Sequence, residues 1–106
     1  MVVIKYGIDI PVDTIQLNLK RIINQVYKLL PTREEGGDWI KPLSTLMEEL
    51  TGMSYLVEVI DFFPLLCKME GLRTLTHEED FTLFRRTVFE CLNLLNEVSQ
   101  DVSRQP

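Results

Sequence analysis

The sequence predicts an all-α protein: a small antiparallel bundle of three long helices and one short helix, preceded by an extended N-terminal arm. Three stretches carry apolar residues at alternating steps of three and four, which places each set on one stripe of an α-helix. The sets are Ile15, Leu19, Ile22, Val26 and Leu29; Trp39, Leu43, Leu46, Leu50, Met53, Val57 and Ile60; and Phe81, Phe84, Val88, Cys91, Leu95, Val98 and Val102. Short connections favour antiparallel neighbours that bury these stripes together.

Length and composition indicate one globular domain. The chain has 106 residues, of which 45% are hydrophobic and 25% charged, values typical of soluble domains with a single core. We expect an arm over residues 1–11, a bundle over 12–102 and a frayed tail over 103–106. No apolar run approaches the ~20 residues that span a bilayer, so no membrane partner is expected. Cys67 and Cys91 lie among apolar residues, which predicts reduced core cysteines and a cytoplasmic protein.

The arm has the alternating pattern of a β-strand. Its apolar residues are Val2, Ile4, Tyr6, Ile8 and Ile10, and the period of two places them on one side of an extended segment. No second strand is predicted, so the arm either lies extended over the bundle or pairs with a strand of a partner. The second possibility makes Ile4, Tyr6 and Ile8 candidate partner-binding residues.

The first helix is predicted over Thr14–Leu30. Pro11 ends the strand pattern, and Asp13 is suited to cap the helix because Gln16 completes a capping box. The helix should end before Pro31, since the residue before a proline disfavours helical geometry.

The second helix is predicted over Trp39–Ile60, with Asp38 as its cap and Pro42 in its first turn. Gly52 lies inside this range at a cost of about 1 kcal/mol relative to alanine. The alternative is a break at Gly52, with Ser54 capping a new helix.

A short helix is predicted over Phe62–Glu70, with Asp61 as its cap and Gly71 as its terminator. The last helix is predicted over His77–Ser99, capped by Thr76. The lone histidine has no second histidine with which to build a metal site, and no catalytic residue or cofactor is expected.

Two carboxylate pairs offer an alternative. Glu35-x-x-Asp38 and Glu58-x-x-Asp61 are separated by nineteen residues, and carboxylates on facing helices can hold Mg²⁺ against phosphates. This arrangement resembles the MazG family of all-helical nucleoside triphosphate pyrophosphohydrolases, which carries Glu-x-x-Glu on one helix and Glu-x-x-Asp on the next. The resemblance covers these four residues and implies Mg²⁺-dependent hydrolysis with all four as ligands. The first pair departs from the pattern because Gly36-Gly37 interrupts it.

Apolar residues beyond the three stripes predict a contact surface. A small bundle does not easily bury all of them, and exposed aromatic area usually marks an interface. The candidate partner-binding residues of the bundle are Phe62, Phe63, Leu66 and Phe89.

The predicted function is therefore a non-enzymatic protein–protein interaction module, either a small subunit or adaptor of a larger assembly or a homo-oligomer. A second alternative is a regulator that binds an amphipathic peptide in a groove near Leu65, Leu66 and Met69. Direct nucleic-acid binding is not expected, because the net charge is −5 and the second half is the more acidic.

Overall fold

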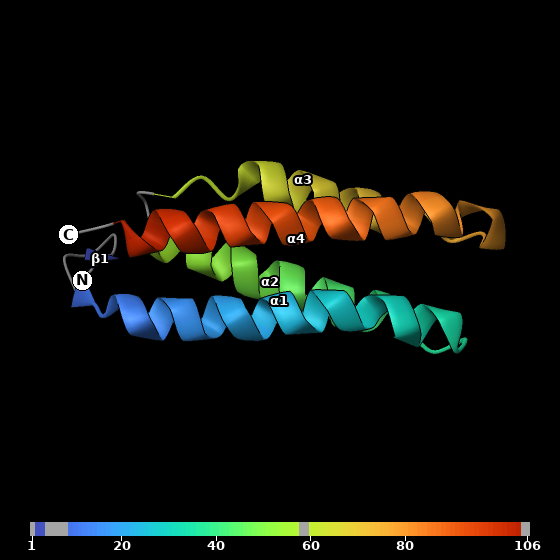
Figure 1. The fold of residues 1–106 in the computed structure, drawn as a ribbon, viewed down its shortest axis with the longest axis horizontal. Helices are drawn as coiled ribbons and strands as arrows, with labels where there is room; N and C mark the ends of the chain where they lie inside the picture. The colour runs from blue at the N-terminus through green and yellow to red at the C-terminus, as the bar shows by residue number, and fades with distance from the viewer. Residues whose placement is uncertain (1, 4–8, 58–59, 105–106) are drawn as a thin grey trace.

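The computed structural model describes residues 2–3, 9–57 and 60–104. Four α-helices make up most of this part of the chain: α1 (Val12–Glu34), α2 (Ile40–Leu56), α3 (Phe63–Leu72) and α4 (Phe81–Ser103). Each runs antiparallel to the next, and α4 returns beside α1 to close an elongated bundle of 46 × 20 × 20 Å (Figure 1). The predicted fold class, three long helices and one short one in an antiparallel bundle, is confirmed.

The core is apolar throughout the described residues, in which no polar or charged side chain is buried. The three predicted stripes face it with few exceptions; Met53 and Phe81 are only half-buried. The short helix α3 adds Leu65, Met69 and Leu72 to the same core. Burial of such stripes against one another is what stabilises helices of this length, since propensity alone does not.

The N-terminal arm pairs with itself. Strand β1 (Val2–Val3) lies antiparallel to β2 (Asp9–Ile10), with Val2 opposite Ile10. The prediction that the arm has no strand partner within the chain is therefore corrected for its two ends. Residues 4–8 lie outside the described part of the chain, so the partner-binding role of Ile4, Tyr6 and Ile8 stays a prediction.

Helix α1 is longer than predicted at both ends. It begins at Val12, and the Pro11 carbonyl accepts the first N–H bond, from Thr14 at 3.1 Å. Asp13 lies in the first turn and is not the cap, so that prediction was wrong. Pro31 lies in the last turn, where its missing N–H costs a single helical bond, and the helix continues to Glu34.

The end of α1 is set by a glycine in the left-handed region. Gly36 has φ of 77°, and the N–H of Gly37 donates to the Thr32 carbonyl at 2.8 Å. This six-to-one bond defines the Schellman motif, which glycine permits at no steric cost.

Helix α2 begins one residue later than predicted, at Ile40, and ends early. The Asp38 carboxylate accepts the N–H groups of Ile40 at 3.1 Å and Lys41 at 3.3 Å, which confirms it as the cap. The helix passes through Gly52, so the alternative break there was wrong. It ends at Leu56 rather than Ile60.

Replacing Gly52 by alanine is expected to raise the free energy of unfolding by about 0.5–1 kcal/mol, because alanine loses less backbone entropy in a helix. An added Cβ would meet no atom within 4 Å. Urea denaturation followed by circular dichroism measures the change. The matched control is Gly36→Ala, whose φ of 77° should make it destabilising by about 1 kcal/mol. A destabilised Gly52→Ala would contradict the placement of Gly52 inside α2.

Helix α3 has the predicted cap and a later end. The Asp61 carboxylate accepts the N–H of Phe63 at 3.0 Å, as predicted. Gly71 does not terminate the helix: it lies inside α3 without a positive φ, and the helix ends at Leu72.

The start of α4 differs from the prediction in its cap. His77, not Thr76, precedes a 3₁₀ turn, η1 (Glu78–Asp80), and the Asp80 carboxylate accepts the His77 N–H at 3.2 Å. The α-helix proper begins at Phe81 and continues past the predicted end, Ser99, into the range expected to fray.

Candidate interaction face

Two of the predicted contact residues are neighbours in sequence, but one is buried in the core and the other is exposed to solvent. Phe62 is 2% exposed and belongs to the core, whereas Phe63 is 70% exposed. The prediction that Phe62 contacts a partner was wrong, because successive residues entering a helix point about 100° apart and only one of the two can face solvent. Leu66, one turn along α3, is half-buried against the core.

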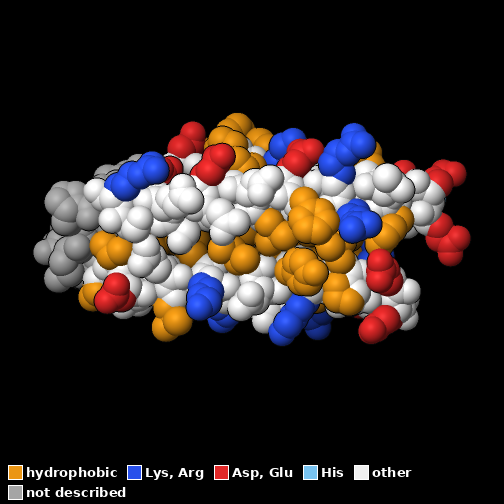
Figure 2. All heavy atoms as spheres, in the orientation of Figure 1, with side chains coloured by type: hydrophobic (Ala, Val, Ile, Leu, Met, Phe, Trp, Pro, Cys, Tyr) orange, Lys and Arg blue, Asp and Glu red, His pale blue; other side chains and the backbone are white. Residues whose placement is uncertain are grey.

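Phe89 lies on a different surface, on the α1 side of α4. Its side chain is 40% exposed, and it lines a shallow pocket with Tyr27 of α1, which is 55% exposed. Figure 2 shows apolar side chains gathered along the seam between α4 and α1. We call this surface the seam patch; its lining residues are Tyr27, Leu30, Pro31, Glu34, Arg85 and Phe89.

The seam patch combines aromatic area with charge. The Arg85 guanidinium lies 5.8 Å from the centre of the Phe89 ring, close enough for a cation–π interaction. Glu34 lines the same pocket from the opposite helix. An apolar centre with a polar rim is the usual composition of a protein–protein contact surface.

The end of the bundle beside this patch is held together by Arg33. Its guanidinium donates to the carbonyls of Leu75 and of His77, the latter at 2.7 Å. It also lies over the rings of Phe84 at 4.4 Å and Trp39 at 5.0 Å, and these two rings meet edge to face with centroids 4.8 Å apart. Arg33 thus joins the last turn of α1 to the α3–α4 connection.

Burial lowers the pKa of Arg33, and the nearby Asp80 carboxylate opposes this shift. The guanidinium remains charged at neutral pH, as arginine does in proteins. The predicted first helix ends before Pro31, so Arg33 lay outside it and this role was missed. A signal was present, because Arg33 follows Leu29 by four residues and so continues the buried stripe of α1.

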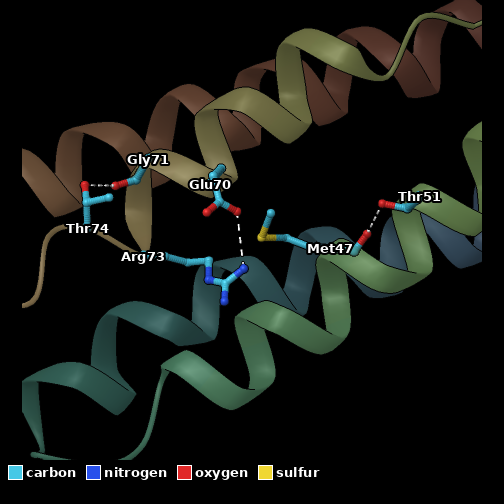
Figure 3. A network of polar contacts seen from close by, with 6 residues as sticks. All are labelled: Met47, Thr51, Glu70, Gly71, Arg73 and Thr74. Carbon is cyan, nitrogen blue, oxygen red and sulfur yellow. Dashed lines mark hydrogen bonds and ion pairs between the residues drawn. The ribbon is translucent and has the colours of Figure 1, made fainter.

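Polar contacts on the α2–α3 side lie on the surface and are mostly local (Figure 3). Arg73 pairs with Glu70 at 3.3 Å within the same end of α3, and Thr51 donates to the Met47 carbonyl at 2.8 Å within α2. Exposed pairs of this kind contribute little to stability.

The four carboxylates of the hydrolase alternative do not gather in the part of the chain that is described. Asp38 and Asp61 each cap a helix, and they lie before and after α2, whose 17 residues span about 25 Å. Glu35 is exposed at the end of α1, and Glu58 lies outside the described residues. Among those residues no group of three or more Asp, Glu, His or Cys could hold a metal ion.

Two of the residues predicted to line a groove near α3, Leu65 and Met69, are buried in the core. A groove beside α3 is lined by other residues: Pro64, Cys67, Lys68, Gly71, Thr74, Leu75, Leu83 and Thr87. A more apolar groove of about 410 Å³ lies between α1 and α2. The Arg21–Glu49 ion pair, at 2.6 Å, joins the two helices beside it. The groove residues are Thr14, Ile15, Asn18, Arg21, Ile22, Glu49, Gly52, Met53 and Val57.

The two cysteines have different environments. Cys91 is buried in α4 as predicted, and burial raises its pKa to about 12. Cys67 is exposed, which corrects the prediction of a core position, because it points outward from the short helix α3.

We therefore expect one rapidly reacting thiol per folded chain. At pH 8 a maleimide should label Cys67 within minutes and leave Cys91 unmodified, since the thiolate is the reactive form and burial suppresses it. Intact mass spectrometry of native protein should show one adduct, and protein unfolded in urea should show two. Equal labelling of both thiols in the native protein would contradict the buried position of Cys91.

No helix in the described part of the chain is both long and apolar enough to cross a membrane. Comparisons of the chain with protein-family models, with curated proteins and with solved structures give no match.

Proposed function

We propose that this chain is a non-enzymatic protein–protein interaction module, a small helical subunit or adaptor that docks through the seam patch. The observation that carries the proposal is the pairing of Tyr27 and Phe89, two half-exposed aromatic side chains from different helices around one shallow pocket. Aromatic residues in such positions dominate the binding energy of many interfaces. The core beneath them is apolar.

The net charge and the exposed cysteine support a protein partner and a cytoplasmic location. A net charge of −5 disfavours contact with nucleic-acid phosphates, so the partner is a protein. We place the module in the cytoplasm, where an exposed thiol such as that of Cys67 stays reduced. Phe63 and Leu66 remain candidate contacts on a separate surface of α3.

Size-exclusion chromatography of extracts tests the proposal. In the cells that naturally produce it, a tagged chain should elute well above its 12.4 kDa monomer mass. The variant Phe89→Glu should elute as a monomer, because a carboxylate in the patch opposes burial. The matched control is Leu83→Glu, also on α4 and 48% exposed but on the α3 side, which should elute like the native chain. Elution of all three as monomers, or equal loss in both variants, would contradict the proposal.

A regulator that captures an amphipathic peptide is the second candidate, supported by the apolar groove between α1 and α2. Gly52→Leu separates the two, since a leucine at the groove mouth would obstruct a peptide there and leave the seam patch intact. If larger complexes are lost in Gly52→Leu and kept in Phe89→Glu, the groove is the docking site.

A further inference from the structure

We propose that the occupant of the seam patch is a second copy of this chain, related by a two-fold axis that runs along the α1–α4 seam. This inference rests on the proposed function and names its partner. It follows from how aromatic and charged side chains are distributed on the two helices.

The first step is the alignment of α1 with α4. The two helices are antiparallel neighbours along their length. At one end Gln16 donates from Nε2 to the Ser99 carbonyl at 3.5 Å. At the other end Glu34 and Arg85 line one pocket with the two aromatic residues. These residues of α1 and α4 therefore lie at matching positions along the long axis of the bundle, which we call levels.

The second step is the sign of the charges at these levels. At the pocket, α1 carries the anion Glu34 and α4 carries the cation Arg85. Near the Gln16–Ser99 contact the signs are reversed: Lys20 on α1 and Glu97 on α4 are both exposed. With a rise of 1.5 Å per residue, Lys20 lies about 6 Å and Glu97 about 3 Å from that contact along the bundle, both in the direction of the pocket.

The third step is the effect of a two-fold axis along the seam. Such an axis exchanges the two helices while keeping each level in place, so α1 of one copy lies over α4 of the other. Glu34 then faces Arg85 of the second copy, and Lys20 faces Glu97. The ion pairs formed within the described part of the chain use none of these four side chains, which leaves them available for contact between copies.

The aromatic residues follow the same symmetry. Tyr27 of one copy lies over Phe89 of the other, and the reciprocal pair forms on the other side of the axis. The outline of the α1–α4 face, 46 × 20 Å or about 900 Å², leaves room for the ~800 Å² that each partner contributes to a typical stable interface. The aromatic centre and the charges thus agree on a self-complementary surface.

The test is a charge exchange measured by sedimentation equilibrium at low salt. The native chain should show a mass approaching twice 12.4 kDa. Glu34→Arg and Arg85→Glu, each alone, should weaken self-association about tenfold, because two like-charge contacts form in each dimer. An equimolar mixture of the two variants should recover association to within about threefold of native, since every contact in the mixed dimer is again of opposite sign.

Recovery in the mixture is specific to this axis. Mixing does not change the charges within either variant chain. Stronger association in the mixture than in each variant alone can therefore arise only from a contact between copies. A two-fold axis across the seam would instead place Glu34 against Lys20 and Arg85 against Glu97. A mixed dimer of the two variants would then keep two like-charge contacts. The mixture would stay dissociated, and the proposed axis would be wrong. High salt should reduce the differences among the variants.

A native chain that sediments as a monomer up to about 1 mM, above the Kd of weak specific complexes, would overturn self-association. The proposed function would fail separately, by monomeric elution of the native chain from extracts or by equal loss of complexes in Phe89→Glu and Leu83→Glu. A chain that is monomeric when pure but elutes in a Phe89-dependent complex from extracts would retain the function and refute the second copy as partner.

Discussion

Replacing Phe62 by alanine is expected to lower the free energy of unfolding by about 3–5 kcal/mol, because it removes a large buried ring and leaves a cavity. Phe62 is 2% exposed and is among the largest fully buried side chains of the described core. It lies where the chain enters α3, so the short helix should lose its anchor to the bundle. Urea denaturation followed by circular dichroism and by tryptophan fluorescence measures the change.

The adjacent residue is the matched control. Phe63 is 70% exposed, so Phe63→Ala should change the free energy of unfolding by less than about 0.5 kcal/mol. The two variants remove the same side chain from neighbouring positions, and their difference therefore reports burial alone. Similar effects in both, or a larger effect for Phe63→Ala, would contradict the orientation of α3.

Replacing Arg33 by alanine is expected to cost about 2–4 kcal/mol of unfolding free energy. The substitution removes the donor from the carbonyls of Leu75 and His77. The His77 bond is exposed, so water replaces most of it, whereas the part-buried bond to Leu75 from a charged donor contributes about 1.5–3 kcal/mol. The substitution also removes the guanidinium from the Phe84 and Trp39 rings, a contact of about 0.5–2 kcal/mol. Thermal and urea unfolding measure the total.

Two further variants separate the causes. Arg33→Lys keeps the charge but lacks the planar fork that reaches two carbonyls, so it should recover less than half of the loss. Lys28→Ala, an exposed position of the same helix, should have an effect within about 0.5 kcal/mol. If Arg33→Lys were as stable as the native chain, the two hydrogen bonds would not be the source of the effect.

The fold was predictable because the apolar pattern leaves little choice. Each long stripe keeps the three-four spacing for four or more turns, and no competing period of two extends beyond the arm and the first turns of the first helix. Short connections then fix the antiparallel order. The buried residues of α1, α2 and α4 match the predicted stripes closely for this reason.

The helix ends were less predictable because local signals compete with packing. Pro31 and Gly71 both favour termination in sequence, and both lie inside helices near their ends. Each costs little at such a position, whereas extending the helix buries an apolar or amphipathic neighbour: Arg33 after Pro31, and Leu72 after Gly71. Burial outweighs propensity at both sites.

The candidate face could be predicted only in part. Phe89 was identifiable as a surplus aromatic residue, but its proximity to Tyr27 depends on how α1 and α4 align, which no local pattern contains. The same limitation explains Phe62, which sequence could not distinguish from Phe63. The contribution of Arg33 depends on rings from α4 and from the α1–α2 connection, and such contacts arise only in the folded chain.

Site-specific photo-crosslinking tests the central claim, that the seam patch is a contact surface, most directly. A photoreactive phenylalanine analogue placed at position 89 in the native cells should give discrete protein adducts on illumination. The same analogue at position 83 on α4 should give few, although Leu83 is the more exposed side chain, at 48% against 40% for Phe89. Adducts that follow exposure, with position 83 equal to or above position 89, would contradict the account.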